Sequence, residues 1–266
     1  MTTRRLGVVR YSNAAPLIDG LPEDEQRWGP PASVAAWWAA GEVDVALLPA
    51  VELARHPGST PLLPGHGVAA RGRCRSVLLF SRVEHLSELR RVRLDGDSRC
   101  AAALTRVLLA RRGHPEVVVA PPVDGDLSAR LEGVDAALLI GDPALHADRE
   151  AGAELARIDL AAEWARWTGL PFVFACWALR PGLSDDPGQR RVLDEAAERG
   201  LARLDALAEQ EAVRSGLPVP ELRDYFDELV YRLDEDCRVG LERFLTEVRA
   251  LGLDRHATAT CEVAGT

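Results

Sequence analysis

Short apolar runs alternate with helix-like segments through the first two-thirds of the chain, and this alternation constrains the fold more than any other feature. The predicted strands lie at residues 6–10, 43–48, 77–81, 92–95, 117–120, 136–140 and 172–179. The predicted helices lie at residues 14–20, 33–40, 100–112 and 159–167, and a further one begins near Pro143. Strands that alternate with helices are typical of α/β proteins with parallel sheets. We therefore expect mainly parallel sheets flanked by helices.

The last third of the chain is predicted to be helical. Leucine and alanine recur at helical spacing between residues 193 and 208 and again between residues 241 and 251. A chain of 266 residues is long enough for two lobes. We expect lobe I at residues 1–80 plus 180–266 and lobe II at residues 81–179, with the C-terminal helices packed on lobe I. Residues 77–81 and 172–179 would form the hinge, and the cleft between the lobes would bind the ligand.

The charged residues exclude several classes of function. The formal net charge of −9 argues against nucleic acid as a partner, because phosphate binding requires a basic face. All 32 basic residues are arginine, which excludes Schiff-base chemistry, a Walker A loop and Ser–Lys nucleophiles. An anionic substrate would therefore be held by local donors and not by the net charge of the protein.

No membrane segment, metal site or cofactor site is expected. The first apolar run ends at Arg10, so we predict neither a signal peptide nor a transmembrane helix, and a cytoplasmic location. The five cysteines show no CxxC spacing and are expected to be reduced and structural. The six histidines lie singly, without a metal-binding motif. Residues 65–70 imitate a dinucleotide fingerprint, but Pro64 precedes them and no helix follows, so we reject it.

Polar residues and glycines gather at or near the ends of predicted strands, where open α/β sheets bind their ligands. They are Tyr11, Asn13, Ser76, Ser98, Arg99, Gly141, Asp142, Thr168 and Gly169. Ser98 precedes a predicted helix, whose free N–H groups and dipole favour a bound carboxylate. Each residue alone is more typical of a cap or a turn. Together they predict one cleft lined from several loops.

Five sequence blocks resemble those of the chorismate dehydratases, which act in the futalosine route to menaquinone. They are LGVVRYSNAAPL at residues 6–17, GEVDVALLP at 41–49, SVLLFS at 76–81, IGDPAL at 140–145 and WTGLPFVFA at 167–175. The last block is the most specific, and the resemblance spans about residues 6 to 180. It implies a two-lobed fold like the type II periplasmic binding proteins. It also implies that chorismate is the substrate and loses water to give 3-[(1-carboxyvinyl)oxy]benzoate.

The matched loops offer no histidine, lysine or glutamate, and this leads to a working hypothesis for their polar residues. Asn13 and Ser76 would position the enolpyruvyl carboxylate of the substrate or stabilise the developing anion, and that carboxylate would remove the ring proton. Asp142 is the alternative general base, or else a structural cap. The family favours hydroxyl residues where this chain has Cys100 and Ala101. Backbone N–H donors at those positions would remain.

Two other functions stay open. One is the sister enzyme of the same pathway, which releases a naphthoate from a cyclic futalosine derivative, although the WTGLPF segment favours the dehydratase. The other is a solute-binding protein without catalysis, against which the missing export signal argues. The oligomeric state is not predicted.

Overall fold

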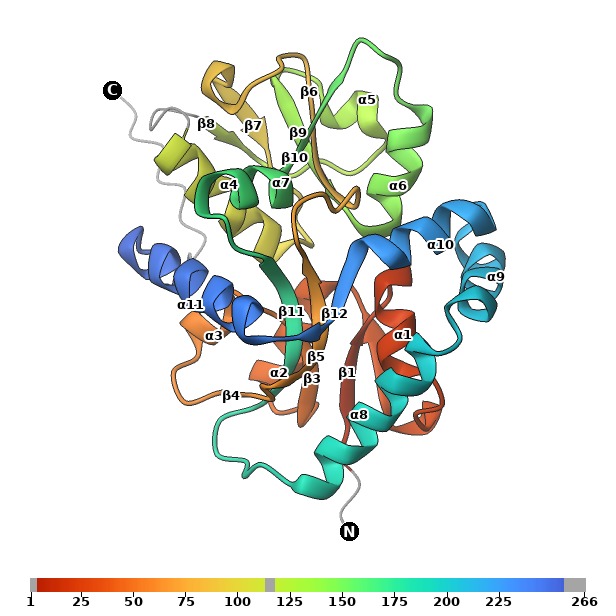
Figure 1. The fold of residues 1–266 in the computed structure, drawn as a ribbon. Helices are drawn as coiled ribbons and strands as arrows, with labels where there is room; N and C mark the ends of the chain where they lie inside the picture. Colours follow the sequence, from red (N-terminus) through yellow and green to blue (C-terminus); the bar gives the residue numbers. More distant parts are fainter. Residues whose placement is uncertain (1–3, 113–117, 256–266) are drawn as a thin grey trace.

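The computed structural model describes residues 4–112 and 118–255, which form two lobes around two β-sheets (Figure 1). The first sheet has the order β12-β5-β11-β3-β1-β2, with β4 beside β11. Its strands are β1 (Leu6–Val9), β2 (Gln26–Gly29), β3 (Val45–Pro49), β4 (Thr60–Pro61), β5 (Gly65–Ala70), β11 (Phe172–Leu179) and β12 (Leu229–Leu233). The second sheet has the order β10-β6-β9-β7-β8. Its strands are β6 (Val77–Ser81), β7 (Arg91–Arg93), β8 (Val118–Ala120), β9 (Ala136–Ile140) and β10 (Ala156–Asp159).

Both sheets are mixed, so the prediction of mainly parallel sheets is wrong. Only β1 with β2 and β3, and β7 with β8 and β9, pair in parallel among the described strands. The strand β11 runs antiparallel to β3, β4 and β5, and β12 runs antiparallel to β5. In the second sheet β6 runs antiparallel to β9 and β10. The physical reason is the path of the chain. Strand β11 enters the first sheet when the chain returns from the second lobe, and β12 enters it after the helical segment at residues 187–228. Neither strand follows its neighbour in the sheet through the short helical crossover that gives parallel pairs.

The strand pairings show that the chain crosses between the lobes at other residues than predicted. All of β6 pairs within the second sheet and all of β11 within the first. The chain therefore crosses at residues 71–76 and again at 169–171, and not within the two strands that were expected to form the hinge. The predicted boundaries after residues 80 and 179 assign both strands to the wrong lobe. Of the predicted strand at 117–120, Val117 lies outside the described residues, as does Gly113, which was expected to end the preceding helix.

Helices cover both sheets, and several begin or end at the residue types that favour this. They are α1 (Ala15–Ile18), α2 (Pro31–Ala39), α3 (Glu52–Arg55), α4 (Arg99–Arg112), α5 (Leu127–Arg130), α6 (Gly141–Glu150), α7 (Leu160–Thr168), α8 (Pro187–Leu201), α9 (Leu204–Ser215), α10 (Val219–Glu228) and α11 (Glu235–Ala250). Asp159 caps α7 by accepting the N–H groups of Ala161 and Ala162. Helix α2 begins at Pro31, whose ring suits a first turn, and not after Ser33 as a cap.

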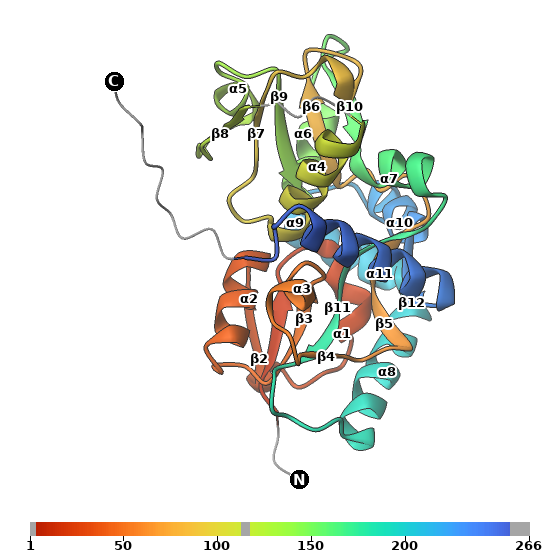
Figure 2. The same cartoon turned by 90° about the vertical axis from the view of Figure 1, so that its left-hand side faces the viewer.

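The C-terminal helices contact both lobes, whereas the sequence predicted contact with the first lobe alone. Helix α8 packs on α1 and β5 of the first lobe. Helix α11 lies between the lobes (Figure 2) and touches α3 and β11 on one side and α4 on the other. Arg111 of α4 forms a 2.8 Å ion pair with Glu247 of α11. The C-terminal helices therefore tie the lobes together.

An aromatic cluster fills the second crossing. Trp164 of α7 packs edge-on against Phe172 of β11, with centroids 5.5 Å apart, and Phe172 packs against Phe244 of α11 at 4.8 Å. Edge-to-face aromatic pairs add to the stabilisation from burial. In the ranges that the structure describes, no helix has the length and apolar character needed to cross a membrane.

Candidate active site

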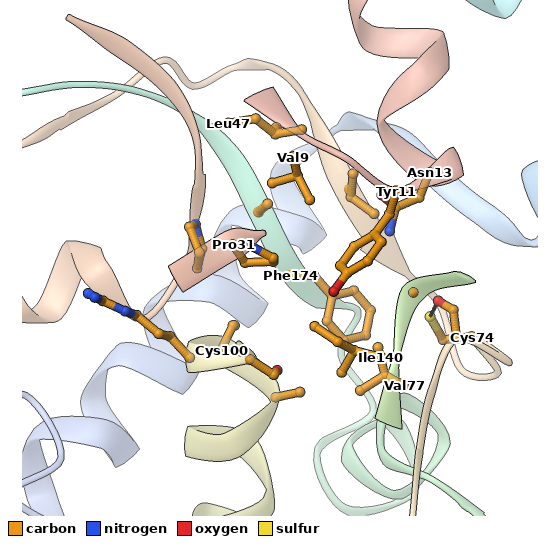
Figure 3. A pocket seen from close by; sticks show the side chains of 18 residues that line it. Val9, Tyr11, Asn13, Pro31, Leu47, Cys74, Val77, Cys100, Ile140 and Phe174 are labelled. Carbon is orange, nitrogen blue, oxygen red and sulfur yellow. Dashed lines mark hydrogen bonds between the residues drawn. The ribbon is translucent and has the colours of Figure 1, made fainter. Parts of the chain in front are cut away.

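A cavity lies between the two lobes and is lined from both (Figure 3). The empty space between its lining residues, open solvent included, is about 590 Å³. Strands β1, β3, β5 and β11 line it from the first lobe, and β6, β9 and the start of α4 line it from the second. Six predicted site residues are among the lining residues: Tyr11, Asn13, Ser76, Ser98, Arg99 and Gly141.

Three lining side chains carry polar groups with no hydrogen-bond partner among the described residues. They are the hydroxyl of Tyr11, the amide of Asn13 and the hydroxyl of Ser98. In Figure 3 the Tyr11 ring reaches from the loop after β1 into the cavity, with Asn13 beside it. Ser98 is only 4% exposed. Tyr11 and Asn13 are only partly buried, so these three groups, at the wall of one cavity, are free to hydrogen-bond to a polar ligand.

Gly141 allows the Tyr11 ring to lie where it does. Its φ of +61° is in the left-handed region, and a Cβ there would lie 2.6 Å from the Tyr11 ring. The N–H of Gly141 donates to the carbonyl of Ser76 at 2.8 Å, which joins α6 to the loop before β6. Burial, and then the carboxylates of Asp95 and Asp97, raise the pKa of Tyr11 above its usual range. Tyr11 is therefore a neutral hydrogen-bond donor at every physiological pH.

The Ser76 hydroxyl is held by Tyr225, a residue that does not line the cavity. Ser76 is 1% exposed, and its hydroxyl accepts a hydrogen bond from the Tyr225 hydroxyl at 2.7 Å. The same oxygen lies 3.4 Å from the Cys74 sulfur. Burial raises the pKa of Tyr225 well above its usual value, so this phenol stays protonated. The Ser76 proton is thus left to point at the weakly accepting sulfur or into the cavity.

The start of helix α4 supplies the positive potential of the cavity. Ser98 to Ala101 line it at the N-terminus of this 14-residue helix, where the dipole and the unbonded N–H groups favour an anion. Arg99 is the one charged side chain among the lining residues that are described. Its guanidinium lies 3.3 Å from the fully buried Glu52 carboxylate. The arrangement can therefore hold carboxylates mainly with neutral donors.

Comparison with known proteins decides the family. A family model described as menaquinone biosynthesis matches residues 4–250. The chain is 35% identical over 264 residues to the chorismate dehydratase of Thermus thermophilus, which covers 93% of this chain and 95% of that protein. The chain belongs to the chorismate dehydratase family of menaquinone biosynthesis.

Solved structures confirm the predicted fold of this family member. A structural-genomics protein from Archaeoglobus fulgidus matches with a TM-score of 0.75 at 17% identity, covering 94% of this chain and 98% of that one. The periplasmic aliphatic sulphonate binding protein of Escherichia coli matches with a TM-score of 0.64 at 13% identity, covering 94% and 87%. The chain therefore has a two-lobed fold like the periplasmic binding proteins.

Three predicted site residues of this chorismate dehydratase family member do not line the cavity. The Asp142 carboxylate accepts the Ser12 N–H at 3.0 Å through one oxygen and an Arg214 N–H at 2.7 Å through the other. Thr168 donates its hydroxyl to the carbonyl of Trp164 at 2.8 Å, within α7. Gly169, with φ +71°, ends the same helix. All three are structural in their observed contacts, because they satisfy backbone groups or an ion pair.

Sequence reasoning missed the residues that support the cavity from outside. Tyr225 and Arg214 lie on α10 and α9, and they contact Ser76 and Ser12 from 149 and 202 residues away in the chain. Helical periodicity around residue 225 could have predicted burial of the tyrosine. No local pattern could have predicted its partner.

The four described cysteines are buried, and none of them is bonded to another. Cys74 and Cys100 line the cavity, and burial raises the pKa of both thiols to about 12. Cys261, like His114 and His256, lies outside the described residues. Across residues 4–112 and 118–255, no group of three or more His, Cys, Asp or Glu side chains is placed to hold a metal ion.

These pKa values predict that Cys74 and Cys100 resist alkylation. At pH 8 a thiol of pKa 12 is ionised to about one part in 10⁴, and the thiolate is the reactive form. Native protein treated with iodoacetamide at pH 8 should remain unlabelled at both residues by peptide mass spectrometry, and labelling should rise with pH. Protein unfolded in guanidinium is the control, in which both peptides should label. Rapid labelling of either residue in native protein would contradict the prediction.

Proposed function

We propose that the protein dehydrates chorismate to 3-[(1-carboxyvinyl)oxy]benzoate in menaquinone biosynthesis. The observation that carries this proposal is the set of unpartnered neutral donors on Tyr11, Asn13 and Ser98 beside the start of α4. Chorismate has two carboxylates, and these donors suit them without a lysine. The 35% identical relative from Thermus thermophilus, a chorismate dehydratase, supports the same substrate.

The reaction needs no electron acceptor. The ring carbon that bears the ether loses its proton, and the electrons of that C–H bond form the new ring double bond. The C–O bond at the neighbouring carbon breaks, and the hydroxyl leaves with a proton as water. Aromatisation supplies the driving force, so the protein has to orient the substrate and stabilise the charge that develops. We accordingly propose catalysis without a cofactor or a metal, in the cytoplasm.

The base in this proposal is the enolpyruvyl carboxylate of the substrate itself. Among the lining residues that are described, no side chain carries a carboxylate. Both oxygens of Asp142, the alternative base, accept hydrogen bonds elsewhere. The Asn13 amide is free to hold the substrate carboxylate near the ring proton, and the Ser76 hydroxyl is free to donate to the developing anion. Removing one such donor typically costs about 10²–10³ in kcat.

Purified protein incubated with chorismate tests the proposal directly. We expect the aromatic product by liquid chromatography, at the same rate before and after EDTA treatment. Activity that vanishes with EDTA and returns with a divalent ion would contradict a metal-free reaction. Release of a naphthoate from the cyclic futalosine substrate, with chorismate untouched, would identify the sister enzyme. Binding of chorismate in calorimetry without turnover would indicate a solute-binding protein.

Ser98→Ala should raise KM more than it lowers kcat. A carboxylate held at the start of α4 is bound alike in the ground and transition states, so its loss appears in KM. A hydrogen bond to a charged group is worth enough for a rise of roughly tenfold. Steady-state kinetics on chorismate measures both constants, and Ser128→Ala, on the exposed face of α5, is the control. A large fall in kcat at constant KM would place Ser98 in the chemical step instead.

Asp142→Asn and Asn13→Asp separate the two candidate bases. If the substrate carboxylate removes the proton, Asp142→Asn should keep kcat within about tenfold, whereas loss of a general base costs about 10²–10⁴. Asn13→Asp should lose more, because it places a negative charge beside the substrate carboxylate. Both are measured as kcat on chorismate, with thermal melts to confirm folding. If folded Asp142→Asn loses three orders of magnitude and still binds product normally, the aspartate is the base.

A further inference from the structure

Residues 74–76 form a tight turn at the first crossing between the lobes. Arg75 has φ +53°, and it is the one non-glycine residue with a positive φ in the described part of the chain. The Ser76 N–H donates to the carbonyl of Cys74 at 2.6 Å, which closes the turn over three residues. L-residues rarely adopt such a conformation, and it persists where the surroundings impose it. Here the turn delivers Cys74 and Ser76 to the cavity wall.

Two carboxylates hold this turn from outside the cavity. One oxygen of Asp159 accepts the N–H groups of Cys74 at 2.7 Å and of Arg75 at 3.1 Å, while its other oxygen caps α7. Glu228, the last residue of α10, accepts the Arg75 Nε–H at 2.8 Å. The ion pair with Glu228 gives a reason for an arginine at a position whose backbone would favour glycine. The turn is therefore fastened to α7 and to α10.

Helix α10 also reaches the Ser76 side chain. Tyr225 lies three residues before Glu228, is 1% exposed, and donates its hydroxyl proton to the Ser76 oxygen at 2.7 Å. With the Tyr225 hydroxyl donating to it, the Ser76 hydroxyl directs its own proton elsewhere. The remaining choices are the Cys74 sulfur at 3.4 Å, a weak acceptor, and the cavity. Tyr225 itself is not among the lining residues.

We propose that α10 positions Ser76 for the reaction: Tyr225 orients the Ser76 hydroxyl as a donor to the substrate, and Glu228 secures the Arg75 turn that carries it. This inference rests on the proposed dehydration of chorismate and on the role of Ser76 in it. Tyr225 and Glu228 are positioning residues, because they act through Ser76 and its turn. Their effect should appear in kcat more than in KM, since orientation matters most where charge develops.

Tyr225→Phe removes the phenolic oxygen alone and is the direct test. We expect kcat on chorismate to fall about tenfold or more, with KM within about twofold of wild type. Tyr231→Phe is a matched control, because Tyr231 is also buried and its hydroxyl has no hydrogen-bond partner within the described ranges. It should leave kcat unchanged. An unchanged kcat in folded Tyr225→Phe would overturn the proposal.

A double-mutant cycle separates orientation of Ser76 from a structural effect. If Tyr225 acts through the Ser76 hydroxyl, Tyr225→Phe should change kcat little in the Ser76→Ala background. An equal loss in both backgrounds would overturn the inference, because the tyrosine would then act elsewhere. If Ser76→Ala matches wild type, the proposed role of Ser76 fails. If wild type does not convert chorismate, the proposed function fails. These outcomes therefore distinguish failure of the Tyr225 inference from failure of the role of Ser76 and from failure of the proposed function.

The turn has a rescue test of its own. Glu228→Ala should lower kcat about tenfold, because the strained turn loses its ion pair. Adding Arg75→Gly should recover much of that loss, since glycine adopts a positive φ without strain. Glu228→Gln, which keeps a hydrogen-bond acceptor, should lose less than Glu228→Ala. If Arg75→Gly restores nothing, or if Glu228→Ala lowers the Tm without changing kcat, the turn does not position Ser76.

Discussion

The placement of the loop that carries Asn13 at the cavity depends most on the hydrogen bonds that the Arg214 guanidinium donates. It donates to the Ser12 hydroxyl at 2.9 Å and to the Asp142 carboxylate at 2.7 Å. Asp142 in turn accepts the Ser12 N–H. Three segments that are distant in sequence therefore meet at one cation: the loop after β1, the start of α6 and the end of α9. Because Asn13 follows Ser12, the position of its amide depends on a contact that spans both lobes.

The C-terminal helices repeat this bridging at other points. His146 of α6 lies 2.8 Å from the carbonyl of Ser215 at the end of α9, and Glu247 of α11 pairs with Arg111 of α4. Helix α10 holds Ser76 through Tyr225. Residues in the last third of the chain therefore hold the loop that carries Asn13 and the turn that carries Ser76 in place. In the proposed reaction, a site built this way would place neutral donors around a substrate whose own carboxylate acts as the base.

Local sequence patterns predicted much of the fold but not its strand directions. The strands at residues 77–81, 136–140 and 172–179 were predicted with their observed bounds, because each is a mostly apolar run of strand length, and Gly or Pro residues follow the last two. The strands β2, β5, β10 and β12 were missed, since charged residues or glycines interrupt them. Whether two strands pair in parallel depends on the chain path between them, which no short window of sequence contains.

The candidate site shows the same division. Asn13 and Ser76 were predicted as site residues from their places at strand ends and from the family resemblance, and both line the cavity. Asp142 and Thr168 have the same local pattern, yet their polar atoms cap or bridge the structure. The sequence alone does not tell a helix cap from a ligand contact, because the difference lies in the hydrogen-bond partner of the side chain. Tyr225 and Arg214 were not found, because each meets its partner across more than a hundred residues.

The central claim is that the substrate supplies the base while the protein supplies position and neutral donors. The most direct measurement uses a chorismate analogue in which the enolpyruvyl carboxylate is replaced by a neutral amide of similar shape. With binding measured by calorimetry and used to ensure saturation, the account predicts that kcat falls by about 10²–10⁴, the usual loss for a missing general base. Turnover of the saturating analogue at a rate close to that of chorismate would contradict the account, because a group of the protein would then be removing the proton.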